Sequence, residues 1–259
     1  MSPNRPALFL TTPPQYLKSA CVYGLPIGHM AYCIGAGGHL LRSSIPIGMR
    51  GGLMVIGDES CDGRGTADTF CSEVMQECAA RKFDGIICDF EKKPSSLSGS
   101  IIEKLGELSS RRNWPFFIPE HYAPFSAKAR IMISSALSGG SLKQRLNEAA
   151  AKYGAEKLVL AVQRSAEDFF LPSPSGGGTP LSREELQKRI QDRAPSIFFS
   201  DELCAHYFTY MSRQSGAHFV LFDDAGSIRK KLFLAKEAGI RQAVLAYPEV
   251  DDLLPALLA

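Results

Sequence analysis

Short apolar runs, rich in β-branched residues and separated by helical patterns, recur along the chain and limit the folds open to it. Most of these runs are continuous, with no alternation of polar side chains, which is typical of parallel strands covered on both faces. The runs are Ala7–Thr11, Met30–Gly35, Gly52–Gly57, Gly85–Glu91, Pro115–Pro119, Ala129–Ser134, Lys157–Gln163, His218–Phe222 and Gln242–Tyr247. Strand and helix alternating in this way predict βα units.

Helical patterns fill the intervals between the runs. Thr69–Lys82 and Ser141–Tyr153 place apolar side chains at helical spacing. The segment Ser182-Arg-Glu-Glu185 has the form of a capping box at a helix start, and Ser227–Ala238 ends at Gly239, a helix stop.

The length of 259 residues allows one large domain or two small ones, and βα units allow a closed barrel or an open sheet. An open nucleotide-binding sheet usually carries a glycine-rich phosphate loop, and neither G-x-G-x-x-G nor a Walker loop occurs here. We therefore expect an α/β fold, a (β/α)8 TIM barrel formed by residues 1–259 as a single domain. The low-complexity stretch Pro172–Pro180 indicates a small insertion after the seventh strand, at about residues 165–215.

Composition narrows the classes of partner. The net charge is only +2, and the longest basic block is Arg229-Lys230-Lys231, which argues against nucleic acid or an anionic membrane. The first residues lack the pattern of a signal peptide or a membrane span, so neither is expected. Seven cysteines without a C-x-x-C pair indicate reduced thiols, so we expect a cytoplasmic protein. The five histidines lack metal-ligand spacing, and no metal is expected.

Two carboxylates mark the run Gly85–Glu91. If this run is a barrel strand, alternation directs Ile87, Asp89 and Glu91 into the barrel, with both acids at the carboxyl end where barrel enzymes carry their catalytic residues. Proximity and burial raise one carboxyl pKa, as a general acid requires. The alternative interpretation is that both acids are solvated or paired with a nearby Lys or Arg.

These residues also carry a family resemblance. Asp84-Gly-Ile-Ile-Cys-Asp89-Phe-Glu91 resembles the Asp-x-x-Asp-x-Asp-x-Glu signature on the fourth strand of family 18 glycoside hydrolases, the chitinase-like barrels. It is most similar to the Asp-Gly-x-Asn-x-Asp-Phe-Glu variant of their spore-associated, peptidoglycan-directed branch. A second segment, His218–Lys231, is similar to the family's ending, where an acidic pair, a Ser-Ile helix start and a Lys precede the last strand.

The resemblance implies substrate-assisted retaining hydrolysis of β-linked N-acetylglucosamine polymers, either peptidoglycan or spore cortex or chitin-type oligosaccharides, without a cofactor. Glu91 is then the acid and base, and Asp89 holds the acetamido N–H and stabilises the oxazolinium. The expected substrate-binding residues are Tyr247, Tyr122, Gln163 and Asp223. The resemblance to the spore-associated branch also implies that the expected cytoplasmic location could more specifically be a spore compartment. No oligomeric state is predicted.

The sequence departs from the family pattern at three places. Ile87 replaces an inward Asp or Asn below Asp89, Ser134 and Ser135 stand where the family has Tyr-Asp, and Tyr247 stands where it has Trp. These departures support an alternative hypothesis, that the chain is an inactive barrel that binds amino-sugar glycans or has a structural role in a spore or cell wall. Glu120-His-Tyr122 and Asp58-Glu59 are weaker candidates for the rim of the cleft, and Trp114 is expected at the far end of the barrel.

Overall fold

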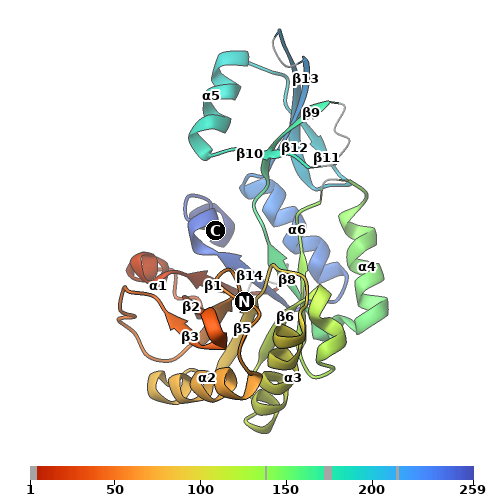
Figure 1. The fold of residues 1–259 in the computed structure, drawn as a ribbon. Helices are drawn as coiled ribbons and strands as arrows, with labels where there is room; N and C mark the ends of the chain where they lie inside the picture. Colours follow the sequence, from red (N-terminus) through yellow and green to blue (C-terminus); the bar gives the residue numbers. More distant parts are fainter. Residues whose placement is uncertain (1–4, 138, 172–176, 214–215) are drawn as a thin grey trace.

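The structure is a computed structural model that describes residues 5–137, 139–171, 177–213 and 216–259 (Figure 1). Eight parallel strands form a closed barrel, because the first strand pairs with both the last and the second. In barrel order they are β1 (Ala7–Thr12), β2 (Ile27–Ile34), β4 (Leu53–Gly57), β5 (Gly85–Asp89), β6 (Phe116–Pro119), β7 (Arg130–Ser134), β8 (Leu158–Val162) and β14 (Gln242–Ala246). The predicted TIM barrel is confirmed. A short strand, β3 (Leu40–Arg42), extends the barrel by antiparallel pairing with β2.

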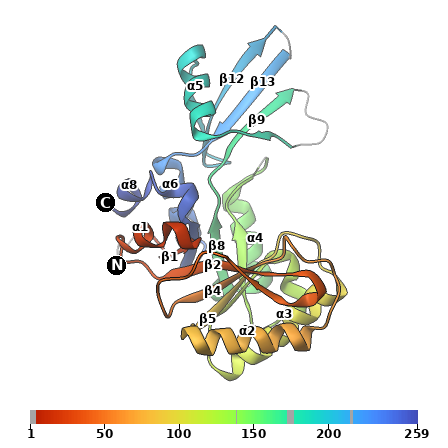
Figure 2. The same ribbon diagram turned by 60° about the vertical axis from the view of Figure 1, so that its left-hand side comes forward.

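Helices follow the strands and cover the outside of the barrel (Figure 2). The described α-helices are α1 (Leu17–Cys21), α2 (Ala67–Arg81), α3 (Ser96–Arg111), α4 (Leu142–Tyr153), α5 (Arg183–Arg193), α6 (Ala225–Glu237), α7 (Tyr247–Val250) and α8 (Leu254–Leu258). Short 3-10 turns are η1 (Pro14–Tyr16), η2 (Ala36–Gly38), η3 (Glu120–Phe125) and η4 (Ala155–Lys157). Among the described helices, none is both long and apolar enough to span a membrane.

Side-chain alternation divides the apolar residues into two cores. One fills the barrel interior and contains Leu53, Val55, Ile87, Phe117, Met132, Val159 and Val244. The other lies between strands and helices and includes Ile86 and Cys88, the neighbours of Ile87 on β5. The predicted inward direction of Ile87 is therefore confirmed. Asp89 is the next residue on the same side of the strand.

An insertion leaves the barrel after β8, the seventh barrel strand, as predicted (Figures 1 and 2). It contains α5 and a five-stranded antiparallel sheet of β10 (Thr179–Pro180), β9 (Ala166–Leu171), β13 (Gly216–Phe222), β12 (Ala205–Ser212) and β11 (Phe198–Ser200). The insertion thus continues beyond residue 215 to Phe222. The run His218–Phe222, expected among the parallel strands, belongs to this sheet, because its residues pair antiparallel with β9 and β12.

A buried ion pair fixes the point where the insertion leaves and re-enters the barrel. Lys231 and Asp223 are both buried, and their Nζ and Oδ2 atoms lie 2.6 Å apart. The same carboxylate accepts a hydrogen bond from the Ser165 backbone N–H at 2.8 Å, and the Asp223 N–H donates to the Ser165 carbonyl at 2.8 Å. The two ends of the insertion are therefore tied to each other and to α6.

Candidate active site

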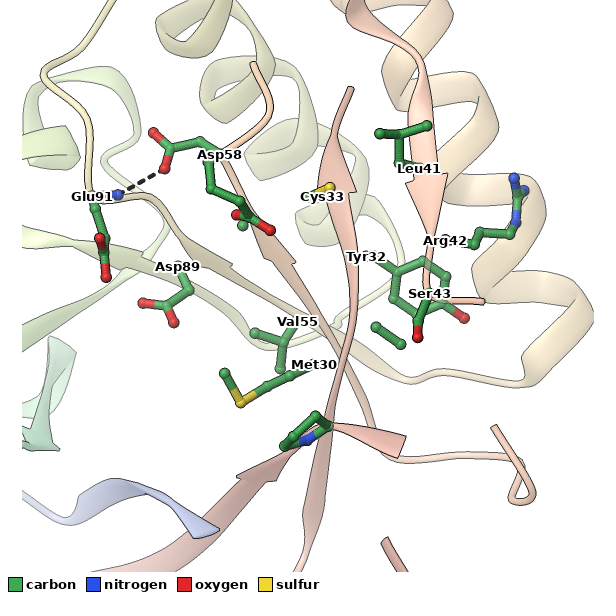
Figure 3. Close-up of a pocket in the computed structure, with 14 residues that line it drawn as sticks. Met30, Tyr32, Cys33, Leu41, Arg42, Ser43, Val55, Asp58, Asp89 and Glu91 are labelled. Atoms are coloured by element: carbon green, nitrogen blue, oxygen red, sulfur yellow. Dashed lines mark hydrogen bonds between the residues drawn. The ribbon is translucent and has the colours of Figure 1, made fainter. Parts of the chain in front are cut away.

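A pocket of about 520 Å³ opens at the carboxyl end of the barrel, beside β2, β4 and β5 (Figure 3). Four acids line it: Asp58, Glu59, Asp89 and Glu91. The cation in its lining, Arg42, is paired with Glu77 at 2.9 Å. The mouth of the barrel is therefore acidic, and the two residues of the predicted carboxylate pair lie in one pocket.

Asp89 is the last residue of β5 and lies directly above Ile87 on the inward side. Asp89 is exposed at the barrel mouth, yet the protein around its carboxyl group withdraws it from water enough to raise its pKa. The negative charges of Glu91, Asp58 and Glu59 raise this pKa further. The raised pKa of the pair therefore belongs to Asp89, whereas the family resemblance assigns the role of general acid to Glu91.

Glu91 lies two residues beyond the end of β5, so the strand is shorter than the expected Gly85–Glu91. Its position depends on Asp58, which follows β4 and is 3% exposed. The Asp58 carboxylate accepts hydrogen bonds from the backbone N–H groups of Glu91 at 2.9 Å and Lys92 at 3.1 Å. Figure 3 shows Asp58 beside the Glu91 backbone, while the side chains of Glu91 and Asp89 extend toward the same space. Asp58, predicted only as a weak rim candidate, is the residue that positions Glu91.

Gln163 lies at the opposite side of the mouth from β4, just after β8. It is exposed, and its Oε1 accepts a hydrogen bond from the Ser134 hydroxyl at 2.6 Å. Ser135, buried beneath it, accepts from the Gln163 backbone N–H at 3.1 Å. The two serines that replace the family's Tyr-Asp therefore hold Gln163 at the rim, where its amide is open to a ligand.

Glu249 is a carboxylate of the mouth that the sequence analysis missed. It lies in α7, directly after β14, the barrel strand opposite β5. Burial raises its pKa, the Arg164 backbone N–H lowers it, and the charge of Asp89 raises it. Its place two residues after Tyr247 was the available signal, because residues that follow a barrel strand at its carboxyl end face the mouth.

Three expected substrate-binding residues are placed away from the ligand space. Tyr122, expected as a rim aromatic, is fully buried, and its hydroxyl donates to Ser98 Oγ at 3.0 Å. Tyr247 is 7% exposed and packs near Tyr16 and Tyr23 in the outer core. Asp223 is buried in the ion pair with Lys231 described above. Tyr122 and Tyr247 pack into the outer core, and Asp223 forms a buried ion pair, so these side chains stabilise the fold in this structure.

Of the remaining weak candidates, Glu59 and His121 are placed separately and form no common site in the described structure. Glu59 lines the pocket, and His121 is exposed, with Nε2 3.3 Å from the Lys92 carbonyl oxygen. Among the described residues, no group of three or more His, Cys, Asp or Glu side chains is arranged to hold a metal ion. All seven cysteines are described and unpaired.

Comparison with solved structures finds the same barrel fold in chitinases and in a spore cortex-lytic enzyme. The chain is similar to a chitinase from Chromobacterium violaceum (TM-score 0.71, 16% identity, 97% of this chain and 98% of that chain). It is also similar to the spore cortex-lytic enzyme SleL from Bacillus megaterium (TM-score 0.68, 17% identity, 94% and 71%).

A family 18 chitinase from Cycas revoluta, solved with allosamidin, is a further neighbour (TM-score 0.66, 14% identity, 97% and 98%). Comparison with protein-family models and with curated proteins found no match. At these identities the likeness shows the fold, and the family resemblance seen in the sequence is confirmed at that level.

Proposed function

We propose that this protein is a glycoside hydrolase that acts on β-linked N-acetylglucosamine polymers. The observation that carries the proposal is the placement of Asp89 and Glu91 in one pocket at the carboxyl end of the fourth barrel strand. Catalytic residues of TIM barrels collect at this end. The named activities of the structural neighbours, chitinases and a spore cortex-lytic enzyme, support the same class of substrate.

In the proposed reaction, Glu91 protonates the glycosidic oxygen, and the substrate's own acetamido oxygen attacks the anomeric carbon. Asp89 accepts the acetamido N–H and stabilises the positive oxazolinium, and water then opens the intermediate with Glu91 as base. Asp58 is the positioning residue, because it holds the backbone of Glu91 through two N–H groups. No step requires a cofactor.

The pocket lining favours non-crystalline glycans, in particular peptidoglycan or spore cortex, over crystalline chitin. Tyr32 is its aromatic residue, and that side chain is 6% exposed with its hydroxyl bound to Glu77. Neither Tyr122 nor Tyr247 offers an exposed ring in its place. A processive path along a crystalline polymer needs a series of exposed aromatic faces for sugar stacking.

The decisive experiment compares Glu91→Gln with the wild type on aryl N-acetylglucosaminides, chitin oligomers and spore-cortex fragments. Loss of the acid is expected to lower kcat by about 100-fold or more, within the usual contribution of general acid–base catalysis. Glu184→Gln, the same change at an exposed position on α5, is the matched control. Turnover that is insensitive to Glu91→Gln removes Glu91 from the mechanism.

A second candidate function is glycan binding without hydrolysis, which Ile87 favours. This side chain is 1% exposed in the barrel interior directly below Asp89, where it can neither share a proton nor donate a hydrogen bond. Calorimetry separates the two functions: micromolar binding of N-acetylglucosamine oligomers with no products after long incubation supports the binding protein. Absence of both binding and products contradicts both proposals.

We also propose that the protein resides in the cytoplasm, or in a spore compartment derived from it. The seven unpaired cysteines support this location, because disulfides are rare in reducing compartments. Labelling thiols in unfolded protein from its native source is expected to find all seven. Recovery of disulfides contradicts this location.

A further inference from the structure

A second pocket lies at the amino end of the barrel, away from the acidic mouth. It measures about 540 Å³ and lies below β6 and β7, next to the end of α3. Among the described residues, its lining contains two cations, Lys128 and Arg130, and no carboxylate. Phe9, Gly106, Ser110, Asn113, Trp114, Pro115, Phe116, Phe117 and Gln242 complete it. The volume is that of a site for a small organic ligand.

Arg130 is the central feature of this pocket. It is the first residue of β7 and lies on the same side of the strand as Met132, which points into the barrel interior. Its guanidinium donates a hydrogen bond to Gln242 Oε1 and lies 5.6 Å from the centroid of the Phe117 ring. Within the described parts of the chain, no carboxylate forms an ion pair with it.

A half-buried cation with only neutral partners is unusual, since charges withdrawn from water are normally paired. The planar guanidinium has several N–H donors arranged to grip a carboxylate or phosphate, and Gln242 satisfies only part of them. Lys128 is exposed at the edge of the same pocket and has no carboxylate partner among the described residues. The pocket therefore offers two positive groups to an anion.

The surroundings strengthen the positive potential. A neighbouring hollow of about 790 Å³ shares Phe9 with the pocket and is lined by Arg5, Lys236 and Arg241, with no carboxylate in the part of its lining that the structure describes. Arg112 lies 5.5 Å from the centroid of the Trp114 ring. One carboxylate, Asp84, lines a third hollow that shares Phe9 and Pro115 with the pocket, but the cations of the two other hollows outnumber it, and this excess of positive charge favours an anion at the base.

We propose that the base pocket binds a small sugar or ring compound that carries a phosphate or a carboxylate. The oxyanion contacts the Arg130 guanidinium and the Lys128 ammonium, and the ring packs against Trp114 and Phe9. A phosphate and a carboxylate can both fill this role, since a guanidinium binds either group in a bidentate manner. The proposal is independent of the reaction proposed for the mouth.

Trp114 makes the test specific for the site, because it is the single tryptophan of the chain. The full-length protein is titrated with a hexose 6-phosphate, a hexuronate, inorganic phosphate and the neutral hexose, by calorimetry and by tryptophan fluorescence. Saturable binding that shifts Trp114 emission is expected for at least one charged sugar and not for the neutral hexose. The phosphate and hexuronate arms identify which oxyanion is preferred.

Charge-removing variants complete the experiment. Arg130→Gln is expected to weaken binding by about tenfold or more, as loss of a charge-assisted hydrogen bond predicts, and Lys128→Gln to weaken it less. Lys188→Gln, at an exposed site on α5, is the control and is expected to bind like the wild type.

Lys128 is exposed, so its variant keeps the test valid even if Arg130→Gln does not fold. Equal binding of the neutral hexose, binding without a change in Trp114 emission, absence of binding by every charged ligand, or binding unaffected by Lys128→Gln overturns the proposal.

Discussion

Asp58→Asn is the most informative perturbation of the candidate active site. The buried Asp58 carboxylate accepts two backbone N–H groups, one from Glu91 at 2.9 Å and one from Lys92 at 3.1 Å. The amide of asparagine keeps one acceptor oxygen and turns an N–H₂ donor toward the second backbone N–H. One hydrogen bond to a charged group is therefore lost, and the other becomes a neutral one.

The size of the effect follows from these two contacts. A hydrogen bond to a charged group contributes about 1.5–3 kcal/mol, so Asp58→Asn is expected to lower the free energy of unfolding by about 2–3 kcal/mol. The backbone of Glu91 is then less firmly held. If Glu91 is the catalytic acid, its displacement is expected to lower kcat by about 10- to 100-fold.

Denaturant unfolding measures the stability, and hydrogen exchange measures the local effect at the Glu91 and Lys92 amides. Asp62→Asn is the matched control, because the Asp62 carboxylate also binds backbone N–H groups, those of Gly37 and Arg64, but from an exposed position. Water replaces those contacts, so the control is expected to lose less stability. Wild-type stability together with unchanged exchange at the two amides refutes the positioning role of Asp58.

Three further changes test the electrostatics and packing of the barrel. Burial and nearby acids raise the pKa of Asp89 in the folded chain, so ionisation of Asp89 destabilises the fold as the pH rises from the ordinary pKa of 3.8 through the raised pKa. Asp89→Asn should therefore stabilise the protein at neutral pH and give no gain in stability in acid, as measured by unfolding across pH. Ile87→Asn should cost about 1–3 kcal/mol of stability and raise kcat more than it improves KM, and an unchanged kcat in an active protein refutes the argument that Ile87 limits catalysis. Lys231→Met should cost about 3–5 kcal/mol by leaving Asp223 buried without its partner, with KM unchanged; a KM effect at full stability would return Asp223 to the substrate site.

The barrel was largely predictable because parallel strands that are covered on both faces appear in the sequence as continuous runs of apolar residues. Gly52–Gly57 and Lys157–Gln163 match the third and seventh barrel strands closely. The helix α3 was missed although Leu97, Ile101 and Leu105 recur at helical spacing, since its serines and glycines resemble a loop. In the insertion, the run of β13 was predicted but assigned to the parallel strands, whereas β9 and β12 were not predicted, because a half-exposed antiparallel strand need not form a continuous apolar run.

Within the site, the residues on strands were predictable and those beyond them were not. Alternation along β5 correctly placed Ile87 inside the barrel. Tyr122 could not be placed, because its turn η3 brings the ring beneath Ser98 of α3, a contact between distant segments. The role of Asp58 depends likewise on how the loops after β4 and β5 meet.

In the proposed reaction, the acidic mouth stabilises the positive charge that develops on the substrate. Arg42, the cation of the pocket lining, is engaged by Glu77, so the protein itself supplies little positive charge to offset Asp89, Glu91 and Glu59. A neutral sugar does not change this balance, whereas the oxazolinium brings a positive charge beside Asp89. Because Asp89 is disfavoured as an anion until that charge appears, its interaction strengthens during the reaction and stabilises the transition state more than the bound substrate.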